Sequence, residues 1–179
     1  MGAPFETRPA SVDDLDAILA IVQVGFDSYV DFMPAGWRPP DAFAGRERTA
    51  ELLEHPDTWA LIALADGEPI AHVAFTPARE RVEDEPPAWT DRPRIPGLAH
   101  LWQLFALPPW WGRGVAPALH DAALAEMRAR GYHGARLFTP AASERARRFY
   151  ERRSWRAVGE EWFEALAMRC TEYRLELRR

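Results

Sequence analysis

A short loop with two glycines is the first feature of this chain that could do chemistry. The segment 104–116 reads Leu-Phe-Ala-Leu-Pro-Pro-Trp-Trp-Gly-Arg-Gly-Val-Ala, so an apolar run ends at Pro108 and a helical pattern begins after Gly114. Glycine lets a backbone approach a ligand closely, and a helix N-terminus offers unpaired N–H groups. The pattern predicts a phosphate or diphosphate site, with Arg113 as an added cation. Ordinary turn chemistry would give the same spacing and remains an open alternative.

A tyrosine on an amphipathic helix is the second such feature. The segment 143–155 reads Ser-Glu-Arg-Ala-Arg-Arg-Phe-Tyr-Glu-Arg-Arg-Ser-Trp, and Ala142, Ala146, Phe149 and Tyr150 share its inner face. A tyrosine with a pKa of about 10 keeps its proton at neutral pH and could protonate a leaving group. The same Phe-Tyr pair would also suit a buried core.

Together, the two segments resemble the GNAT superfamily of acyl-CoA N-acyltransferases, whose loop reads Gln/Arg-x-x-Gly-x-Gly/Ala. Gly114 and Ala116 match that loop, and Trp111 stands where Gln or Arg is usual. The family's helix reads Asn-x-x-Ala-x-x-Phe-Tyr-x-x-x-Gly-Phe. The matching residues there are Ala146, Phe149 and Tyr150, while Ser143 replaces Asn and Ser154-Trp155 replaces Gly-Phe.

The resemblance implies that acetyl-CoA is the acyl donor and that no metal is needed. The loop amides would hold the diphosphate, the preceding strand would pair with the pantetheine arm, and Tyr150 would protonate the CoA thiolate. The acetyl group would pass directly to a primary amine while both substrates are bound. The implied donor-binding residues are Leu104, Phe105, Ala106, Trp111, Gly112, Arg113, Gly114, Val115, Ala116, Ser143, Ala146 and Phe149.

The attacking amine must first lose a proton, because an ammonium group with a pKa of about 10.4 has no lone pair at pH 7. Many family members use a glutamate on the fourth strand, but the strand at 98–104 has no carboxylate. We expect His100 to serve as the base, since its unperturbed pKa is about 6.5. His72 is the second choice, and the acids at 83–85 are the third. A structural histidine and a water chain are the alternatives.

The acceptor is left open by the sequence. Residues 27–40 combine aromatic side chains with three prolines, which predicts either a wall of the acceptor pocket or a loop pinned to the core. Aromatic walls favour an apolar or aromatic acceptor, whereas acids at 80–85 would attract a cationic one. We therefore expect a small-molecule or peptide amine. The predicted acceptor-binding residues are Tyr29, Phe32, Trp37, His72 and Trp102.

Composition narrows the class of protein. The 179 residues suit one domain, 1–179, and 47% hydrophobic content can supply a core. A net charge of -5 argues against nucleic acid as a partner. No apolar run approaches the roughly 20 residues that span a membrane, and the N-terminus lacks a signal-peptide pattern, so we expect a cytoplasmic protein. The single Cys170 excludes an internal disulfide. Family members are often dimers, so the expected state is a monomer or a homodimer.

The helical and strand patterns alternate in the order β-α-α-β-β-β-α-β-α-β-β, which predicts an α/β (α+β) fold. The resemblance adds a mixed, largely antiparallel sheet, splayed at its central strands and flanked by about four helices. Asp66-Gly67 predicts a hairpin turn. We also expect a long loop over 77–97, His120 facing solvent, and Arg145 on the outer face of its helix. The expected strands are 5–9, 59–65, 69–76, 98–107, 133–139, 157–164 and 168–177, and the expected helices are 11–26, 42–54, 114–131 and 142–153.

Two other classes of function compete with the enzyme. The departures at Trp111 and Ser143, with the missing glutamate, would suit a non-catalytic acyl-CoA-binding sensor or interaction module. A nucleotide-binding domain that uses the same glycine loop is the weaker alternative.

Overall fold

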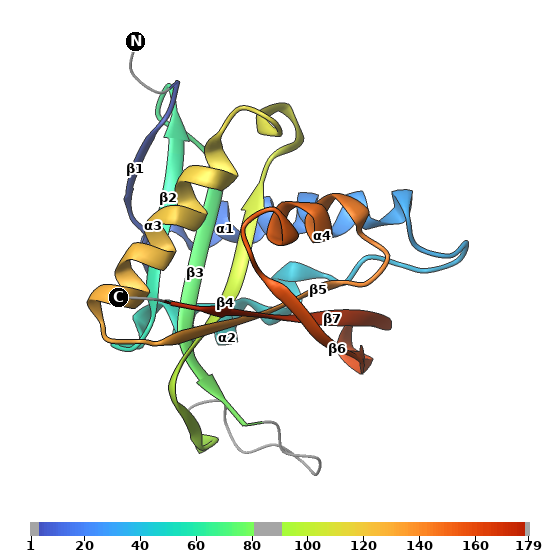
Figure 1. Cartoon of the computed structure of the whole chain (residues 1–179). Helices are drawn as coiled ribbons and strands as arrows, with labels where there is room; N and C mark the ends of the chain where they lie inside the picture. The colour runs from blue at the N-terminus through green and yellow to red at the C-terminus, as the bar shows by residue number, and fades with distance from the viewer. Residues whose placement is uncertain (1–3, 81–90, 178–179) are drawn as a thin grey trace.

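The strands form one seven-stranded sheet in the computed structural model, which describes residues 4–80 and 91–177 (Figure 1). Their order across the sheet is β1-β2-β3-β4-β5-β7-β6. Among these strands β4 and β5 run parallel, and the other neighbouring pairs are antiparallel. The predicted mixed, largely antiparallel α/β fold is therefore confirmed. The strands are β1 (Glu6–Pro9), β2 (Trp59–Ala65), β3 (Glu68–Arg79), β4 (Arg94–Ala106), β5 (Gly134–Pro140), β6 (Arg156–Phe163) and β7 (Met168–Glu176).

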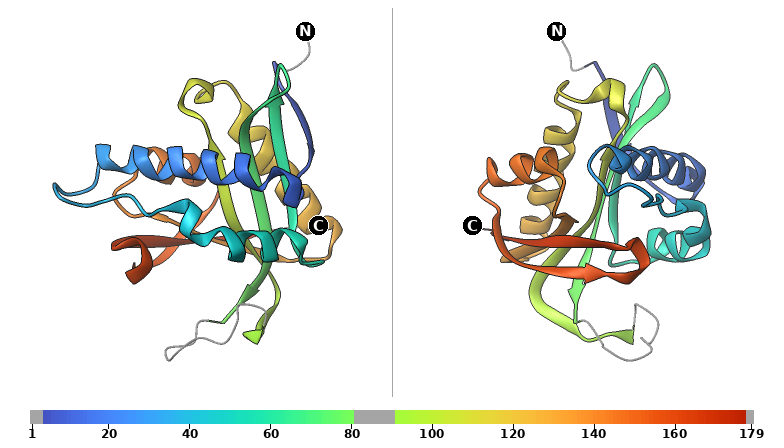
Figure 2. Two further views of the ribbon diagram at one scale, coloured as in Figure 1. Left: turned by 180° about the vertical axis from the view of Figure 1, so that it is seen from behind. Right: turned by 90° about the vertical axis from the view of Figure 1, so that its right-hand side faces the viewer.

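Four α-helices within the described ranges cover the two faces of the sheet. The helices α1 and α2 lie on one face, and α3 and α4 lie on the other (Figure 2). None of these helices has both the length and the apolar character that crossing a bilayer requires. The helices are α1 (Leu15–Asp27), α2 (Arg46–Glu54), α3 (Val115–Ala129) and α4 (Glu144–Glu151).

Two local signals in the sequence fix where elements begin. The Ser11 side chain accepts a hydrogen bond from Asp13 N–H, and the Asp14 carboxylate accepts one from Ser11 N–H, which caps the turn that leads into α1. Asp66 and Gly67 adopt positive φ angles of 51° and 83°, and they join β2 to β3 in a tight hairpin. The hairpin is the one that Asp66-Gly67 predicts from the sequence.

The two parallel strands separate partway along their length. β4 and β5 pair only as far as His100 and Arg136. Beyond these residues the strands diverge, while β4 continues beside β3 to Ala106. β4 holds one more residue than β3 in this stretch, which makes Trp102 the extra residue of a β-bulge. The sheet therefore opens between its central strands, as the resemblance implies.

The core consists of two apolar clusters, one on each face of the sheet. The larger cluster joins the sheet to α3 and includes Phe75, Leu119 and Tyr173, which are all fully buried. The smaller cluster joins the sheet to α1. There the helix approaches β4 closely at Gly25, because the ring of Phe105 occupies the space that a Cβ atom would take.

The loop expected over 77–97 is shorter than predicted. β3 continues to Arg79 and β4 begins at Arg94, so the two strands still pair at this point. Extended backbone that pairs with a neighbour is favoured even where prolines and charges interrupt the sequence pattern. The acids Glu83, Asp84 and Glu85 lie outside the described residues.

The expectation that His120 faces solvent is wrong. Its side chain is 1% exposed. The rings of Phe149 and Trp155 pack against the imidazole at centroid distances of 5.6 and 6.1 Å. The pattern of α3 alone could not reveal this, because both partners belong to the segment that begins with α4.

Candidate functional site

The divergence of β4 and β5 opens a cleft of about 1120 Å³. Its walls are the end of α1 and the turn that follows, the open part of β4, the loop before α3, the end of β5, and one side of α4. Segments far apart in the sequence therefore surround one space. The predicted site residues that line it are Tyr29, Phe32, Trp102, Leu104, Phe105, Ala106, Trp111, Gly112, Gly114, Ala116, Ser143, Ala146, Phe149 and Tyr150.

His72 is not among the lining residues. Its side chain is fully buried within the sheet, level with Ile62 on β2 and Phe105 on β4. Burial lowers the pKa of His72 to about 4, against an opposing effect of Gln103 beside it. This histidine is neutral at pH 7, and its neighbours Gln103 and Phe105 line the cleft while it does not.

His100 also lies outside the cleft lining. Its ring contacts Phe138, which does line the cleft, at a centroid distance of 5.8 Å. Burial, together with the charge of the neighbouring Arg136, lowers the pKa of His100 to about 3. An imidazole with such a pKa is a poor proton acceptor, so the structure argues against the predicted role as general base.

Three more predicted residues contact other parts of the protein. Trp37 donates its Nε1–H to Leu166 O at 3.0 Å and so pins its segment to the connection between β6 and β7. Val115 is fully buried in the core, where only its backbone remains available to a ligand. The Arg113 guanidinium lies over the Trp110 ring, 5.6 Å from its centroid.

The main chain of β4 presents an open edge to the cleft. Leu107 N–H donates to Ile70 O on β3 at 2.9 Å. Backbone groups alternate along a strand, so those of Leu104 and Ala106 point the opposite way, toward the cleft. Trp111 agrees with this assignment, since its Nε1–H donates to Ala106 O at 2.8 Å. Of the three consecutive residues expected to pair with a ligand, the outer two have the required direction.

The glycine loop turns sharply into α3. Gly112 and Gly114 adopt φ angles of 75° and 86°, a region that other residues rarely enter. The first hydrogen bond of the helix runs from Ala118 N–H to Gly114 O at 3.1 Å. The amides of residues 114–116 precede that bond and have no helical acceptor. Pro117 occupies the first turn, where a missing N–H costs little.

Tyr150 lies on the cleft wall inside a shell of rings. Its ring centroid is 5.1 Å from that of Phe149, 5.8 Å from Trp155 and 6.1 Å from Tyr173. The imidazole of His120 follows at 6.4 Å. Burial raises the pKa of Tyr150 well above its ordinary value. The phenol therefore keeps its proton at neutral pH.

Hydrogen bonds fix the imidazole behind Tyr150 in one protonation state. Trp155 Nε1–H donates to His120 Nε2 at 3.0 Å. The proton of the neutral ring must then be on Nδ1, which lies 2.9 Å from the Asp121 carboxylate and donates to it. Burial lowers the pKa of His120, while Asp121 opposes that effect.

The first turn of α4 is capped by a serine. Ser143 Oγ accepts a hydrogen bond from Ala146 N–H at 3.4 Å, which satisfies one of the helix's unpaired amides. At the rim of the cleft Glu144 and Arg148 form an ion pair at 2.9 Å. The spacing of this pair in the sequence predicts that contact.

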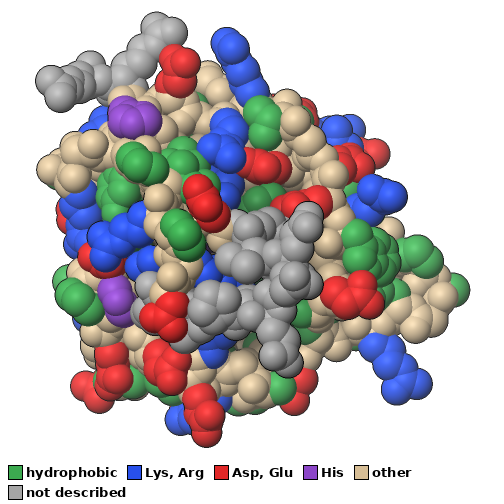
Figure 3. Space-filling view, turned by 90° about the horizontal axis from the view of Figure 1, so that it is seen from below, with side chains coloured by type: hydrophobic (Ala, Val, Ile, Leu, Met, Phe, Trp, Pro, Cys, Tyr) green, Lys and Arg blue, Asp and Glu red, His purple; other side chains and the backbone are tan. Residues whose placement is uncertain are grey.

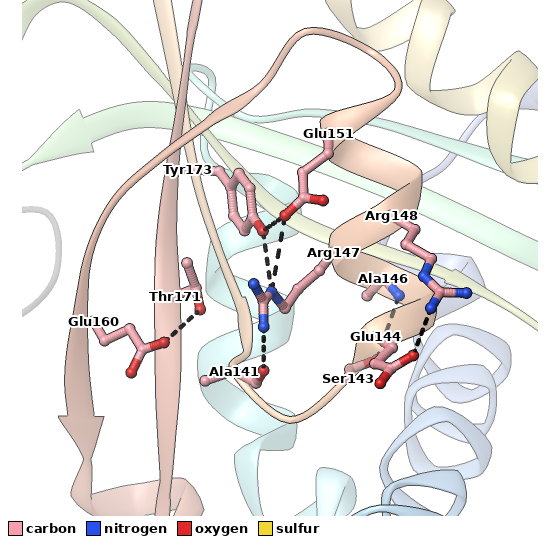
Figure 4. Close-up of polar contacts among 10 residues, drawn as sticks. All are labelled: Ala141, Ser143, Glu144, Ala146, Arg147, Arg148, Glu151, Glu160, Thr171 and Tyr173. Atoms are coloured by element: carbon pink, nitrogen blue, oxygen red, sulfur yellow. Dashed lines mark hydrogen bonds and ion pairs between the residues drawn. The ribbon is translucent and has the colours of Figure 1, made fainter.

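A second set of polar contacts holds α4 against β7 (Figure 4). Arg147 donates to Ala141 O at 3.3 Å and to the Tyr173 hydroxyl at 3.4 Å. The Tyr173 hydroxyl donates in turn to Glu151 at 2.8 Å. These contacts join both ends of the helix to the sheet and so fix the position of Tyr150 on the cleft wall.

The expectation that Arg145 lies on the outer face of α4 is wrong. Its guanidinium carbon lies 3.2 Å from the centroid of the Trp111 ring, and its side chain lines the cleft. Partial burial lowers the pKa of Arg145, while nearby Tyr29 and Asp31 raise it. Helical periodicity distinguishes the buried face of a helix from its exposed face. It does not show which of the exposed residues border a cleft. Other lining residues without a sequence signal are Ser28, Asp31, Gln103, Trp110 and Phe138.

Charge is mixed on the face shown in Figure 3, where basic and acidic side chains alternate around the described part of the surface. Within residues 4–80 and 91–177, no group of three or more His, Cys, Asp or Glu side chains is arranged to hold a metal ion.

The fold and the sequence both have known relatives. An N-acetyltransferase from Staphylococcus aureus superposes with a TM-score of 0.70 at 18% identity, covering 97% of this chain and 99% of its own. The PaiA N-acetyltransferase from Thermoplasma acidophilum, solved in complex with coenzyme A, superposes with a TM-score of 0.68 at 16% identity, covering 96% and 98%. No curated protein matches the sequence. The profile of the acetyltransferase (GNAT) family matches residues 23–155. The chain therefore belongs to the GNAT family of N-acetyltransferases, which is an enzyme family.

Proposed function

We propose that this protein transfers the acetyl group of acetyl-CoA to a primary amine by direct attack, with both substrates in the cleft together. One observation carries the proposal. Tyr150, the glycine loop and the open edge of β4 all line the same cleft. A donor with a diphosphate, an amide-bearing arm and a thioester would therefore find a matching group for each of these parts in one space.

The residues present fit such a donor. The amides of 114–116 and the N-terminus of α3 favour an anion. The backbone groups of Leu104 and Ala106 can pair with the amides of an extended arm, as a sheet edge pairs with an added strand. Although Trp111 already uses one lone pair of Ala106 O, the second lone pair and the Ala106 N–H stay available.

The chemistry then needs two contributions from the protein. The amine attacks the thioester carbonyl, and a main-chain N–H of β4 near Leu104 stabilises the oxyanion. The carbon–sulfur bond breaks as the tetrahedral intermediate collapses. Tyr150 donates its proton to the departing thiolate, and its phenol holds that proton at neutral pH before the step.

The proton of the amine requires a different route from the one the sequence predicts. His72 and His100 are neutral, weakly basic and outside the cleft lining. The described carboxylates on the lining are Asp31 and Glu144, and Glu144 is paired with Arg148. We propose that water in the open cleft accepts the proton, with no dedicated histidine base.

The acceptor end of the cleft favours an amine attached to an apolar or aromatic group. Tyr29, Phe32 and Trp102 line it, together with Phe138 from β5. Tyr29 and Phe32 pack with a centroid distance of 5.2 Å, which makes a continuous aromatic wall. Such a wall binds flat or aliphatic surfaces better than highly charged chains.

The Tyr150→Phe variant tests the proposal. It keeps the ring packing and removes the acidic hydroxyl. We expect kcat for CoA release, measured with a thiol reagent over a panel of amines, to fall about 100-fold or more, while KM for acetyl-CoA changes little. The chain contains no lysine, so acetylation of its own lysine side chains cannot contribute to the signal.

Two outcomes separate the rival interpretations. If acetyl-CoA raises the melting temperature but no amine releases thiol, the protein is a non-catalytic acyl-CoA-binding module. If amines release thiol equally fast with the wild type and with Tyr150→Phe, the enzyme assignment stands and the role of Tyr150 is wrong. A melting shift with ATP and none with CoA would favour the nucleotide-binding alternative.

A further inference from the structure

The side chain of Arg145 is held flat against an aromatic ring at the edge of the cleft. Its guanidinium lies 3.2 Å from the Trp111 ring centroid, which is a face-to-face stack. Within the described residues its nitrogens make no hydrogen bond or ion pair with a protein group. Stacking uses the face of a guanidinium and leaves its N–H edge free. That edge is therefore available to a ligand.

The ring beneath it is also fixed. The Trp111 indole donates its Nε1–H to Ala106 O at 2.8 Å, so it is tied to the end of β4. Trp111 immediately precedes Gly112, the first glycine of the loop. The indole thus forms a platform between β4 and α4 that carries the Arg145 guanidinium beside the glycine loop.

Neighbouring arginines on α4 are already engaged. Arg147 bonds to Ala141 O and the Tyr173 hydroxyl, and Arg148 is paired with Glu144. Arg145 instead has one face of its guanidinium covered by the Trp111 ring and keeps its N–H donors free. A planar guanidinium that is held in place by stacking can offer two parallel N–H donors to paired phosphate oxygens.

We propose that Arg145, carried on the Trp111 indole, binds the diphosphate of the CoA donor. This inference depends on the proposed function, and it adds a residue on α4 to the loop that faces the same anion. Trp111 brings no charge of its own to the loop. Its ring instead supports the Arg145 guanidinium from α4. Arg145 can therefore supply the positive charge that an arginine at position 111 would supply.

Three ligands and one pair of variants test this. Affinities for CoA, dephospho-CoA and pantetheine are measured by calorimetry for the wild type and for Arg145→Ala. We expect Arg145→Ala to weaken CoA and dephospho-CoA about equally, by roughly tenfold or more, and to leave pantetheine unchanged. Arg128→Ala removes one exposed arginine from the far end of α3 and should leave all three affinities unchanged.

Moving the positive charge from position 145 to position 111 gives the most specific test, with CoA affinity as the measured quantity. The double variant Trp111→Arg with Arg145→Ala should recover most of the lost affinity, because the cation returns from the loop side. Equal affinities of the wild type and Arg145→Ala for CoA would overturn the inference. A loss confined to CoA would assign Arg145 to the 3′-phosphate and would equally refute it. If the wild type itself does not bind CoA, the proposed function is wrong. Failure of the proposed function is thus distinguished from failure of the Arg145 proposal alone.

Discussion

Two hydrogen bonds of His120 join residues around Tyr150 that the sequence did not predict to be in contact. Trp155 donates to His120, and His120 donates to Asp121, directly behind the tyrosine ring. The register of the Phe-Tyr pair was enough to predict that Tyr150 faces inward. The partner of Trp155 was not predictable, because His120 belongs to another helix and its own pattern suggests an exposed position.

Trp155→Phe tests that bond. Phenylalanine keeps an aromatic ring in the shell but removes the indole N–H, which leaves His120 Nε2 buried without a donor. We expect the free energy of unfolding, measured with urea, to fall by about 1 to 3 kcal/mol. Trp162→Phe is the matched control, since Trp162 is 51% exposed and should change stability by less than about 0.5 kcal/mol. Equal losses in both variants would show that the buried bond contributes nothing specific.

The case of His100 shows that residue type alone does not tell whether a side chain reaches the cleft. His100 was chosen for its ordinary pKa and for its position on the strand with no carboxylate. The bulge at Trp102 and the end of β4–β5 pairing at His100 place the opening of the sheet just after this residue. A bulge has no reliable sequence signal, so the boundary between paired and open strand could not be drawn in advance.

At the level of elements, the cleft depends on how closely α1 approaches β4. Gly25 allows this approach, because the Phe105 ring fills the space beside its Cα. Phe105 follows the bulge and precedes Ala106, whose backbone faces the cleft. Any shift of α1 away from the sheet therefore moves a cleft wall. The helix periodicity of α1 was evident from the sequence, but its distance from β4 was not.

Gly25→Ala is expected to destabilise the fold by about 1 to 3 kcal/mol, because the added methyl group overlaps the Phe105 ring. Thermal or urea unfolding measures this loss. Gly45→Ala is the control, since Gly45 has a φ of -92° and no atom near the added Cβ. If both substitutions prove neutral, the contact between α1 and β4 is looser than described.

For the whole molecule, the order of elements followed from patterns that repeat over many residues, and the mixed, largely antiparallel sheet followed from the family resemblance. Hydrophobic periodicity, Asp66-Gly67 and the caps each report on local backbone, and together they specified most element boundaries to within a few residues. The long loop over 77–97 was overestimated, because prolines and charges there hide strand pairing up to Arg79. The cleft also draws Arg145 and Trp111 together from different elements. Contacts of this kind depend on tertiary packing and produce no periodic pattern in the sequence.

The central claim is that the opening between β4 and β5 receives an acyl-CoA donor. A crystal structure of the protein with CoA tests it most directly. We expect the pantetheine amides to pair with the backbone of Leu104 and Ala106, the diphosphate to lie at the 112–116 loop, and the thiol sulfur to lie beside the Tyr150 hydroxyl. Density for CoA elsewhere on the protein, or in the cleft with its thiol remote from Tyr150, would contradict it.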